Sequence, residues 1–398
     1  MTKIKRFSHS GLYDPFKSII KIMFICGLDI TIVSGIKNIK SSSGFKFIYQ
    51  KFVAKIWMIF IFYTIGSIVT VDIFAINLES VNRKIARRSV DIAAFLIWSI
   101  MNVKRNDLFI LLQEVQNLLN MKNKEIPKVW ILTGTVIILM VPFTAWMTMT
   151  VPFQDEIDCK LIVKYYSFGF DYVKDGNNCY VLVILTFFQK FSVYTLRTAV
   201  TVNYIIICLS LRNVLKTHSE LGAKMVADPI TKVDYAIFKT YLQTHDRIES
   251  VLKSFEKTMS LPIFLIASSD FMSVMNGFAR MDSINNLPGY KLHIAKFATT
   301  VIFISLRGIV SFLCISLAAS DVYEASKYAR DVQKDMLKRI LRSEEKIDIR
   351  ELVYLSMLHN TPPFILSAWG VFNFTKGLFL SAFGSILTYS LLIMHILK

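Results

Sequence analysis

The segment Thr388-Tyr-Ser-Leu-Leu-Ile-Met-His-Ile-Leu-Lys398 closes the last long apolar run of the chain. A membrane helix that ends a chain and becomes polar only in its final turn is better suited to line a pore than to anchor a protein in lipid. The other apolar segments are therefore interpreted as membrane helices that pack around this one.

Composition indicates a membrane protein. Of the 398 residues, 54% are hydrophobic, and the mean hydropathy is +0.47. A soluble protein of this length needs a more polar surface. The apolar residues also form blocks of about 20, enough to cross roughly 30 Å of hydrocarbon. We therefore predict an all-α, polytopic membrane protein, and we exclude an outer-membrane barrel because its strands are short and alternating.

The net charge of +17 raises the question of nucleic-acid binding. Cytoplasmic loops of membrane proteins collect Lys and Arg, which explains the charge. Nucleic-acid binding needs a basic module with aromatic side chains, and the sequence contains none. We therefore expect no nucleic-acid partner.

Seven membrane spans are predicted, at residues 52–76, 90–103 with an amphipathic continuation to 119, 127–151, 180–211, 259–278, 297–319 and 364–397, the last with a weak point at 373–376. With the N-terminus inside the cell, the cytoplasmic segments hold 27 Lys and Arg and the external segments hold 11. Basic residues gather on the cytoplasmic side, so we predict a cytoplasmic N-terminus and an extracellular C-terminus. The four basic residues of the predicted external loop 77–89 disagree with this rule.

Three of these helices are too long for the bilayer. The fourth span continues to Lys224, the fifth begins near Lys232, and the sixth runs past Ala319 with apolar residues every three or four positions. An amphipathic extension buries its apolar stripe against another element. We therefore predict a helical bundle on the cytoplasmic side.

The sequence shows no pattern typical of catalysis or metal binding. It has no Gly-rich phosphate loop, no Cys/His spacing typical of zinc and no Ser/His/Asp grouping where chemistry needs it. We expect no enzymatic activity, no metal and no cofactor. Cys159 and Cys179 lie in one predicted external loop, where they either form a disulfide or remain two free thiols.

The end of the chain carries a short motif. It reads Thr388-Tyr389, then Ser390-Leu-Leu-Ile-Met394, then His395-Ile396. This motif resembles the hallmark of the insect chemosensory receptor superfamily, and of its gustatory receptors in particular: Thr-Tyr, five hydrophobic residues, Gln-Phe. The lead-in Pro362-Pro-Phe-Ile-Leu-Ser-Ala-Trp-Gly-Val-Phe-Asn373 is similar as well. The resemblance is specific over residues 350–398, and elsewhere it extends only to topology and helix lengths.

The resemblance implies a ligand-gated, nonselective cation channel of four identical or related subunits in the plasma membrane of a sensory neuron. A small-molecule tastant would bind in the outer half of the second to sixth spans, cations would cross the pore, and membrane lipids would surround the assembly. The resemblance implies three parts. Residues 1–320 form the membrane helices and their cytoplasmic extensions, and 212–258 of these belong to a cytoplasmic helical bundle, the anchor. Residues 321–365 complete the anchor, and residues 366–398 form the pore-lining helix. The sequence leaves open both the ligand and the choice between homotetramer and heterotetramer.

Four residues of the last helix share one stripe: Thr388, Leu392, His395 and Ile396. By resemblance, Leu392 forms the gate, an apolar ring that excludes water. His395 stands where the family has Gln, and an imidazole ordinarily titrates near pH 6.5 whereas an amide does not. We expect acid to weaken conduction, because four protonated imidazoles repel cations. The alternative is that His395 only lies at the outer headgroup boundary.

Charged residues inside the spans indicate a ligand site. A mid-membrane Arg costs about 2.5–3.5 kcal/mol and therefore faces protein or water, and Asp270 could neutralise one such cation. The candidate wall comprises Lys190, Arg197, Asp270, Asn276 and Arg307, with aromatic surfaces from Trp98, Trp146, Tyr194 and Phe264. The alternative is a buried ion pair that only holds the helices together.

Two other functions remain open. An odorant receptor subunit gated with a co-receptor belongs to the same superfamily, although the Thr-Tyr start of the motif favours the gustatory branch. A secondary transporter is the alternative from another class, although the sequence lacks the inverted repeats and interrupted helices typical of transporters.

Overall fold

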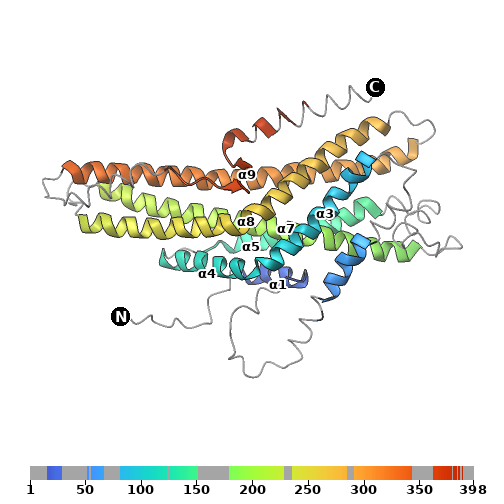
Figure 1. Cartoon of the computed structure of the whole chain (residues 1–398), viewed down its shortest axis with the longest axis horizontal. Helices are drawn as coiled ribbons and strands as arrows, with labels where there is room; N and C mark the ends of the chain where they lie inside the picture. The colour runs from blue at the N-terminus through green and yellow to red at the C-terminus, as the bar shows by residue number, and fades with distance from the viewer. Residues whose placement is uncertain are drawn as a thin grey trace, which may run out of the picture.

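The computed structural model describes residues 16–28, 52, 55–66, 81–122, 125–150, 179–227, 235–284, 291–342 and 362–378, together with 380–382, 384, 385 and 388. Three long helices, α7 (Cys179–Ala227), α8 (Tyr235–Ile284) and α9 (Lys291–Arg342), run side by side along the longest axis of the molecule (Figure 1). They contain 49, 50 and 52 residues. At 1.5 Å per residue, each is about 75 Å long, more than twice the thickness of the bilayer core. The predicted extensions of these helices are therefore confirmed.

Shorter helices pack against the long ones: α1 (Lys17–Ile25), α3 (Val81–Val103), α4 (Arg105–Met121) and α5 (Lys128–Thr150). Within the described residues, four helices are long and apolar enough to cross a membrane, at 128–148, 183–227, 236–275 and 298–341, and shorter apolar helices lie at 55–66 and 90–103. These positions agree with six of the predicted spans. The all-α, polytopic class is confirmed, and the orientation in the membrane stays a prediction.

Two predicted boundaries are wrong. Residues 81–89, predicted as part of a loop, are helical and form the first part of α3. The last span was expected to begin at Phe364, but residues 362–375 are not helical, and the chain becomes helical only at Lys376. Pro362 and Pro363 have no amide proton to donate to a helix, and the turn that follows them reverses the chain. The helical part of segment 366–398 therefore begins ten residues later than predicted.

A short hairpin occupies the place where the last span was expected to begin. β1 (Ser367–Ala368) pairs antiparallel with β2 (Phe372–Asn373). The turn residues Trp369 and Gly370 have φ angles of 53° and 71°, the left-handed pair that a type I′ turn requires. A tryptophan seldom occupies this position, since the left-handed region costs a residue with a Cβ about 1–2 kcal/mol. The hairpin is a small exception to the all-α prediction.

The buried core lies where α7, α8 and α9 meet α1, α3, α4 and the hairpin. Two glycines bring helices into close contact. A Cβ on Gly134 of α5 would lie 2.6 Å from a methyl group of Val202 on α7, and a Cβ on Gly308 of α9 would lie 3.1 Å from the Asp270 carbonyl oxygen of α8. Small residues at such crossings are typical of packed membrane helices.

Candidate functional site

Asp270 is the centre of a buried charge cluster, which we define as Tyr194, Arg197, Asp270 and Arg307. These residues come from α7, α8 and α9. Arg197 Nη2 donates to Asp270 Oδ1 and, at 3.2 Å, to the Ile266 carbonyl oxygen. Arg307 Nη2 donates to the same carboxylate oxygen at 2.6 Å. Since the side chains of Arg197 and Asp270 are each 1% exposed, one carboxylate bridges two guanidinium groups in the interior of the bundle.

Tyr194 closes the cluster on one side. The Arg307 guanidinium carbon lies 5.1 Å from the centroid of the Tyr194 ring, within the range of a cation–π interaction. Side chains of two further helices, α3 and α5, pack in the same place together with others of α7 and α9: Val90, Ala94, Val141, Ala145, Val193 and Phe303. The charge cluster therefore borders the helices that the sequence assigned to the ligand pocket.

The charge cluster keeps hydrogen-bonding capacity that the described residues do not use. Within the described part of the chain, Arg197 Nε and Nη1, Arg307 Nε and Asp270 Oδ2 are buried without a hydrogen-bond partner. A buried polar atom left unpaired costs about 1–3 kcal/mol, so a ligand or a water molecule that satisfies it gains free energy. The cluster can offer both donors and an acceptor to a polar ligand.

Trp146 and Lys190 lie on helices that border the charge cluster. The Trp146 indole donates to the Val183 carbonyl oxygen at 3.2 Å, which joins α5 to α7. Lys190 is half-buried and stands about two turns before Arg197 on the same helix. Their role in a ligand pocket stays a prediction. So does the role of Asn276, whose side chain lies outside the described residues.

Trp98 and Phe264 have described contacts outside the charge cluster, and their role in a ligand pocket stays a prediction. Trp98 Nε1 lies 3.4 Å from the position that a Cβ on Gly27 would take, so its ring packs beside the end of α1. Phe264 packs against Trp369 of the hairpin, with ring centroids 5.6 Å apart. Asp270 lies six positions after Phe264, which places the two about 120° apart around α8. Phe264 therefore faces the hairpin rather than the charge cluster.

Most of the predicted pore and disulfide residues cannot be placed. Three of the pore residues lie outside the described residues: Leu392, His395 and Ile396. Thr388 is helical and exposed, and its hydroxyl donates to the Gly384 carbonyl oxygen at 2.9 Å. Cys159 also lies outside the described residues, and Cys179 opens α7 without a described side chain, so the disulfide stays a prediction.

The hairpin is held by a carboxylate that no sequence pattern indicates. Glu256 Oε1 of α8 accepts hydrogen bonds from the Ser367 hydroxyl at 2.5 Å and from the Ser367 amide at 3.2 Å. Lys376, the first helical residue after the hairpin, pairs with Glu324 of α9 at 3.6 Å. The start of the last helix is therefore tied to two of the long helices. A glutamate on an amphipathic extension gives no sequence signal of such a contact, because solvated glutamates are common there.

Aromatic and basic side chains gather where α7 and α8 extend beyond the predicted spans, in the predicted cytoplasmic extension. The ring of His218 on α7 stacks on that of Tyr241 on α8, with centroids 4.0 Å apart. His218 Nδ1 lies 3.3 Å from the Lys122 ammonium at the end of α4. An ammonium only donates, so Nδ1 accepts and the imidazole proton is on Nε2. Burial lowers the pKa of Lys122, as expected for an amine that packs between three helices.

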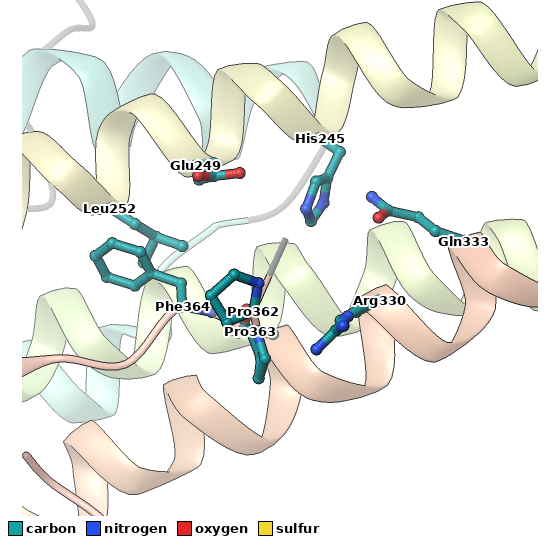
Figure 2. Close-up of a pocket in the computed structure, with 9 residues that line it drawn as sticks. His245, Glu249, Leu252, Arg330, Gln333, Pro362, Pro363 and Phe364 are labelled. Atoms are coloured by element: carbon teal, nitrogen blue, oxygen red, sulfur yellow. Dashed lines mark hydrogen bonds between the residues drawn. The ribbon is translucent and has the colours of Figure 1, made fainter. Parts of the chain in front are cut away.

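A small cavity lies in the same extension, between α8, α9 and the segment before the hairpin (Figure 2). Figure 2 shows His245 and Gln333 pointing toward one another across it. His245 Nδ1 and Gln333 Nε2 have no hydrogen-bond partner among the described residues. The cavity volume of about 20 Å³ admits one water molecule, whereas small-molecule pockets measure about 300–1,000 Å³. This cavity is too small for a tastant.

A wider groove of about 340 Å³ lies on the surface of the extension. Its wall includes Lys122, His218 and Tyr241, and its rim includes the exposed side chains of Leu221 and Ile237. The groove is large enough for a small molecule, but it lies in the predicted cytoplasmic extension, away from the spans that the sequence assigned to the ligand pocket.

Comparison with known proteins decides the family. A family model described as 7tm Chemosensory receptor matches residues 103–396. The chain belongs to this chemosensory receptor family. The match includes the terminal motif, and the resemblance predicted from that motif is confirmed at the level of the superfamily. No curated protein matches the receptor.

The receptor also shares its fold with solved structures of an insect olfactory receptor. The structure of OR5 from Machilis hrabei matches with a TM-score of 0.65 and 13% identity, over 97% of this chain and 98% of that one. The structure of the same protein in complex with eugenol matches with a TM-score of 0.68 and 12% identity, over the same shares. At this identity the likeness shows the fold alone, which is that of a helical membrane protein.

Proposed function

We propose that this receptor is a ligand-gated, nonselective cation channel of the gustatory type. Four identical or related subunits assemble in the plasma membrane of a sensory neuron, and a small-molecule tastant opens the pore by binding among the second to sixth spans. Family membership over residues 103–396 supports the receptor class. The Thr388-Tyr389 start of the terminal motif supports the gustatory branch.

The buried charge cluster is the main observation that supports the proposed ligand site. It joins three of the helices assigned to the pocket, and Tyr194 adds an aromatic surface. Its unpaired donors on Arg197 and Arg307 and its unpaired acceptor on Asp270 are buried. A ligand with polar groups satisfies these atoms, whereas a purely apolar ligand leaves them unpaired at a cost. A polar tastant therefore fits the cluster better than an apolar odorant.

The last helix is the proposed pore lining, with Leu392 as the gate and Thr388, His395 and Ile396 on the same stripe. The described start of this helix is uncovered within one chain, since Leu380 is 71% exposed. Figure 1 shows this segment standing apart from the long helices. An exposed apolar surface marks a contact with lipid or with another protein, and four copies around one axis would supply that contact.

Two other functions compete with this proposal. An olfactory receptor subunit gated with a co-receptor is favoured by one observation, that the neighbouring structures are those of an insect olfactory receptor, one of them in complex with eugenol. A secondary transporter is the candidate from another class, and it would move solute without unitary current steps.

The test is expression of the receptor alone in cells that lack other receptors. Calcium imaging against sugars, alkaloids and volatiles, eugenol among them, is followed by single-channel recording of any response. The proposal predicts unitary current steps evoked by a polar tastant. A response that requires a co-expressed co-receptor would support the olfactory alternative, and uptake without unitary steps would support the transporter.

His395 is expected to make conduction sensitive to acid. Imidazoles that titrate near pH 6.5 are mostly neutral at about pH 7.5 and mostly protonated at about pH 5.5, where four positive charges in the pore repel cations. Wild-type currents should fall over this interval, and those of His395→Gln should stay constant because an amide does not titrate. Equal acid sensitivity in the two proteins would contradict this role.

A further inference from the structure

Helix α8 carries a buried proline, Pro262, in its interior. Proline has no amide proton, so the carbonyl oxygen of Thr258, four residues earlier, loses the helical hydrogen bond that it would otherwise accept. Prolines are a common cause of kinks in long helices, and α8 changes direction part-way along its length in Figure 1. A donor from elsewhere is needed to satisfy the freed carbonyl.

Lys104 supplies such a donor. It is the residue between α3 and α4, and its Nζ lies 3.3 Å from the Thr258 carbonyl oxygen and 2.6 Å from the Lys257 carbonyl oxygen. An ammonium carries three N–H donors, so one side chain can serve both carbonyls. Burial lowers the pKa of Lys104, and Asp107 partly opposes this effect, as expected for an amine drawn from water onto a helix backbone.

This contact lies between the charge cluster and the last helix. On one side, α3 leads back from Lys104 to the packing around Tyr194. On the other side, Glu256 stands two residues before Thr258 on α8 and holds Ser367 of the hairpin. The hairpin in turn precedes the proposed pore helix.

We propose that Lys104 is a positioning residue: its ammonium takes the place of the amide that Pro262 lacks and couples α3, through α8, to the hairpin before the last helix. The part of this inference that concerns gating rests on the proposed function. A shift of α3 changes the Lys104 contact, α8 can bend at Pro262 because its hydrogen-bond ladder is interrupted there, and Glu256 passes the shift to Ser367.

The first measurement is the melting temperature of the purified full-length receptor in detergent. Lys104→Met keeps the length of the side chain and removes the donor, so it is expected to lower the melting temperature by roughly 3 °C. Lys104→Arg should restore most of this loss. Pro262→Ala returns an amide to the Thr258 carbonyl oxygen, so Lys104→Met should cost much less in that background. The control is Lys257→Met, whose side chain is exposed beside the same carbonyls.

The double-mutant comparison can contradict the proposal that the Lys104 ammonium replaces the amide that Pro262 lacks. Equal losses from Lys104→Met with and without Pro262→Ala would show that Lys104 does not replace the missing amide. A loss in Lys257→Met as large as that in Lys104→Met would show that any nearby lysine has the same effect, and would also overturn the inference.

The second measurement is hydrogen–deuterium exchange. It distinguishes coupling of Lys104 to the hairpin from a purely local stabilisation of α8 around residues 257–262. The amides of Val371 and Phe374 donate within the hairpin to Ala368 and Leu366, each at 3.0 Å. In Lys104→Met these two amides should exchange several-fold faster than in wild type. Faster exchange confined to residues 257–262 would overturn the coupling. Neither measurement requires conduction, so a receptor that carries no current would count against the proposed function, and these results would still decide the inference.

Discussion

Asp270→Asn is expected to destabilise the folded receptor by about 3–5 kcal/mol. The substitution preserves the shape of the side chain and removes the charge that Arg197 and Arg307 share. Two guanidinium groups then lie close together in the interior without that counter-charge. Removing one partner of a buried ion pair is far more costly than removing one partner of an exposed pair, because the remaining charge cannot be solvated.

The measurement is the fraction of receptor that stays folded on size-exclusion chromatography after heating in detergent. The matched control is Asp246→Asn, an exposed aspartate on the same helix, for which we expect a change within about 0.5 kcal/mol. Asp270→Asn combined with Arg307→Met removes a cation together with the anion, and should cost less than the sum of the two single changes.

This experiment also tests whether water fills the charge cluster while no ligand is bound. If the cluster is dry, Asp270→Asn should lower the free energy of unfolding by the full amount of about 3–5 kcal/mol given above. If water fills it, the water solvates the guanidinium groups, and the free energy of unfolding should fall by less than about 1 kcal/mol. The burial of Arg197 and Asp270 favours the large effect. A small effect would contradict the closed geometry of the cluster.

Phe255→Ala is expected to cost about 3–5 kcal/mol, the range for a truncated core phenylalanine. Phe255 on α8 is 0% exposed and stacks on Tyr204 of α7, with ring centroids 5.0 Å apart. The Tyr204 ring in turn lies 6.4 Å from the ring of Phe374, directly after the hairpin. Truncation therefore leaves a cavity at the junction of two long helices and removes support from the segment that leads into the last helix.

Thermal unfolding of the purified receptor measures this loss. Phe143→Ala is the matched control, because Phe143 on α5 is 45% exposed and its truncation leaves no enclosed cavity. Phe255→Leu keeps most of the buried volume and should cost clearly less than Phe255→Ala. If Phe255→Ala lowered the thermal stability no more than Phe143→Ala, the stack of Phe255 on Tyr204 would not stabilise the contact between α7 and α8.

The long helices could be predicted because their signal is local. Apolar residues at three- and four-residue spacing continue beyond the length that a bilayer needs, and this pattern indicates both the helix and its buried stripe. The neutralisation of a basic residue by Asp270 could be predicted as well, since charges inside apolar spans are rare and seek partners. That one carboxylate oxygen contacts both Arg197 and Arg307 depends on how three helices cross, which a linear pattern does not contain.

The features that were missed depend on backbone conformation or on partners far away in sequence. The hairpin has Trp369-Gly370 in its turn instead of the usual Asn-Gly or Asp-Gly, so its apolar strands look like the continuation of a membrane helix. The contact of Lys104 is with backbone carbonyl oxygens, which every residue has, so no side-chain pattern reveals it. Phe264 was assigned to the pocket from its residue type, which does not reveal its ring contacts with Trp369 and Phe372 of the hairpin.

Gly308 has a consequence for the evolution of this receptor. A side chain there would meet the Asp270 carbonyl oxygen and a methyl group of Val274, both on α8 and each 3.1 Å from the position of the missing Cβ, and a main chain cannot rotate aside as a side chain can. A larger residue at this position would require α8 and α9 to separate by a few tenths of an ångström, directly beside the contact between Arg307 and the Asp270 carboxylate. Glycine 308 and arginine 307 should therefore be inherited as a unit, and gene duplicates that have lost one are expected to have lost the other.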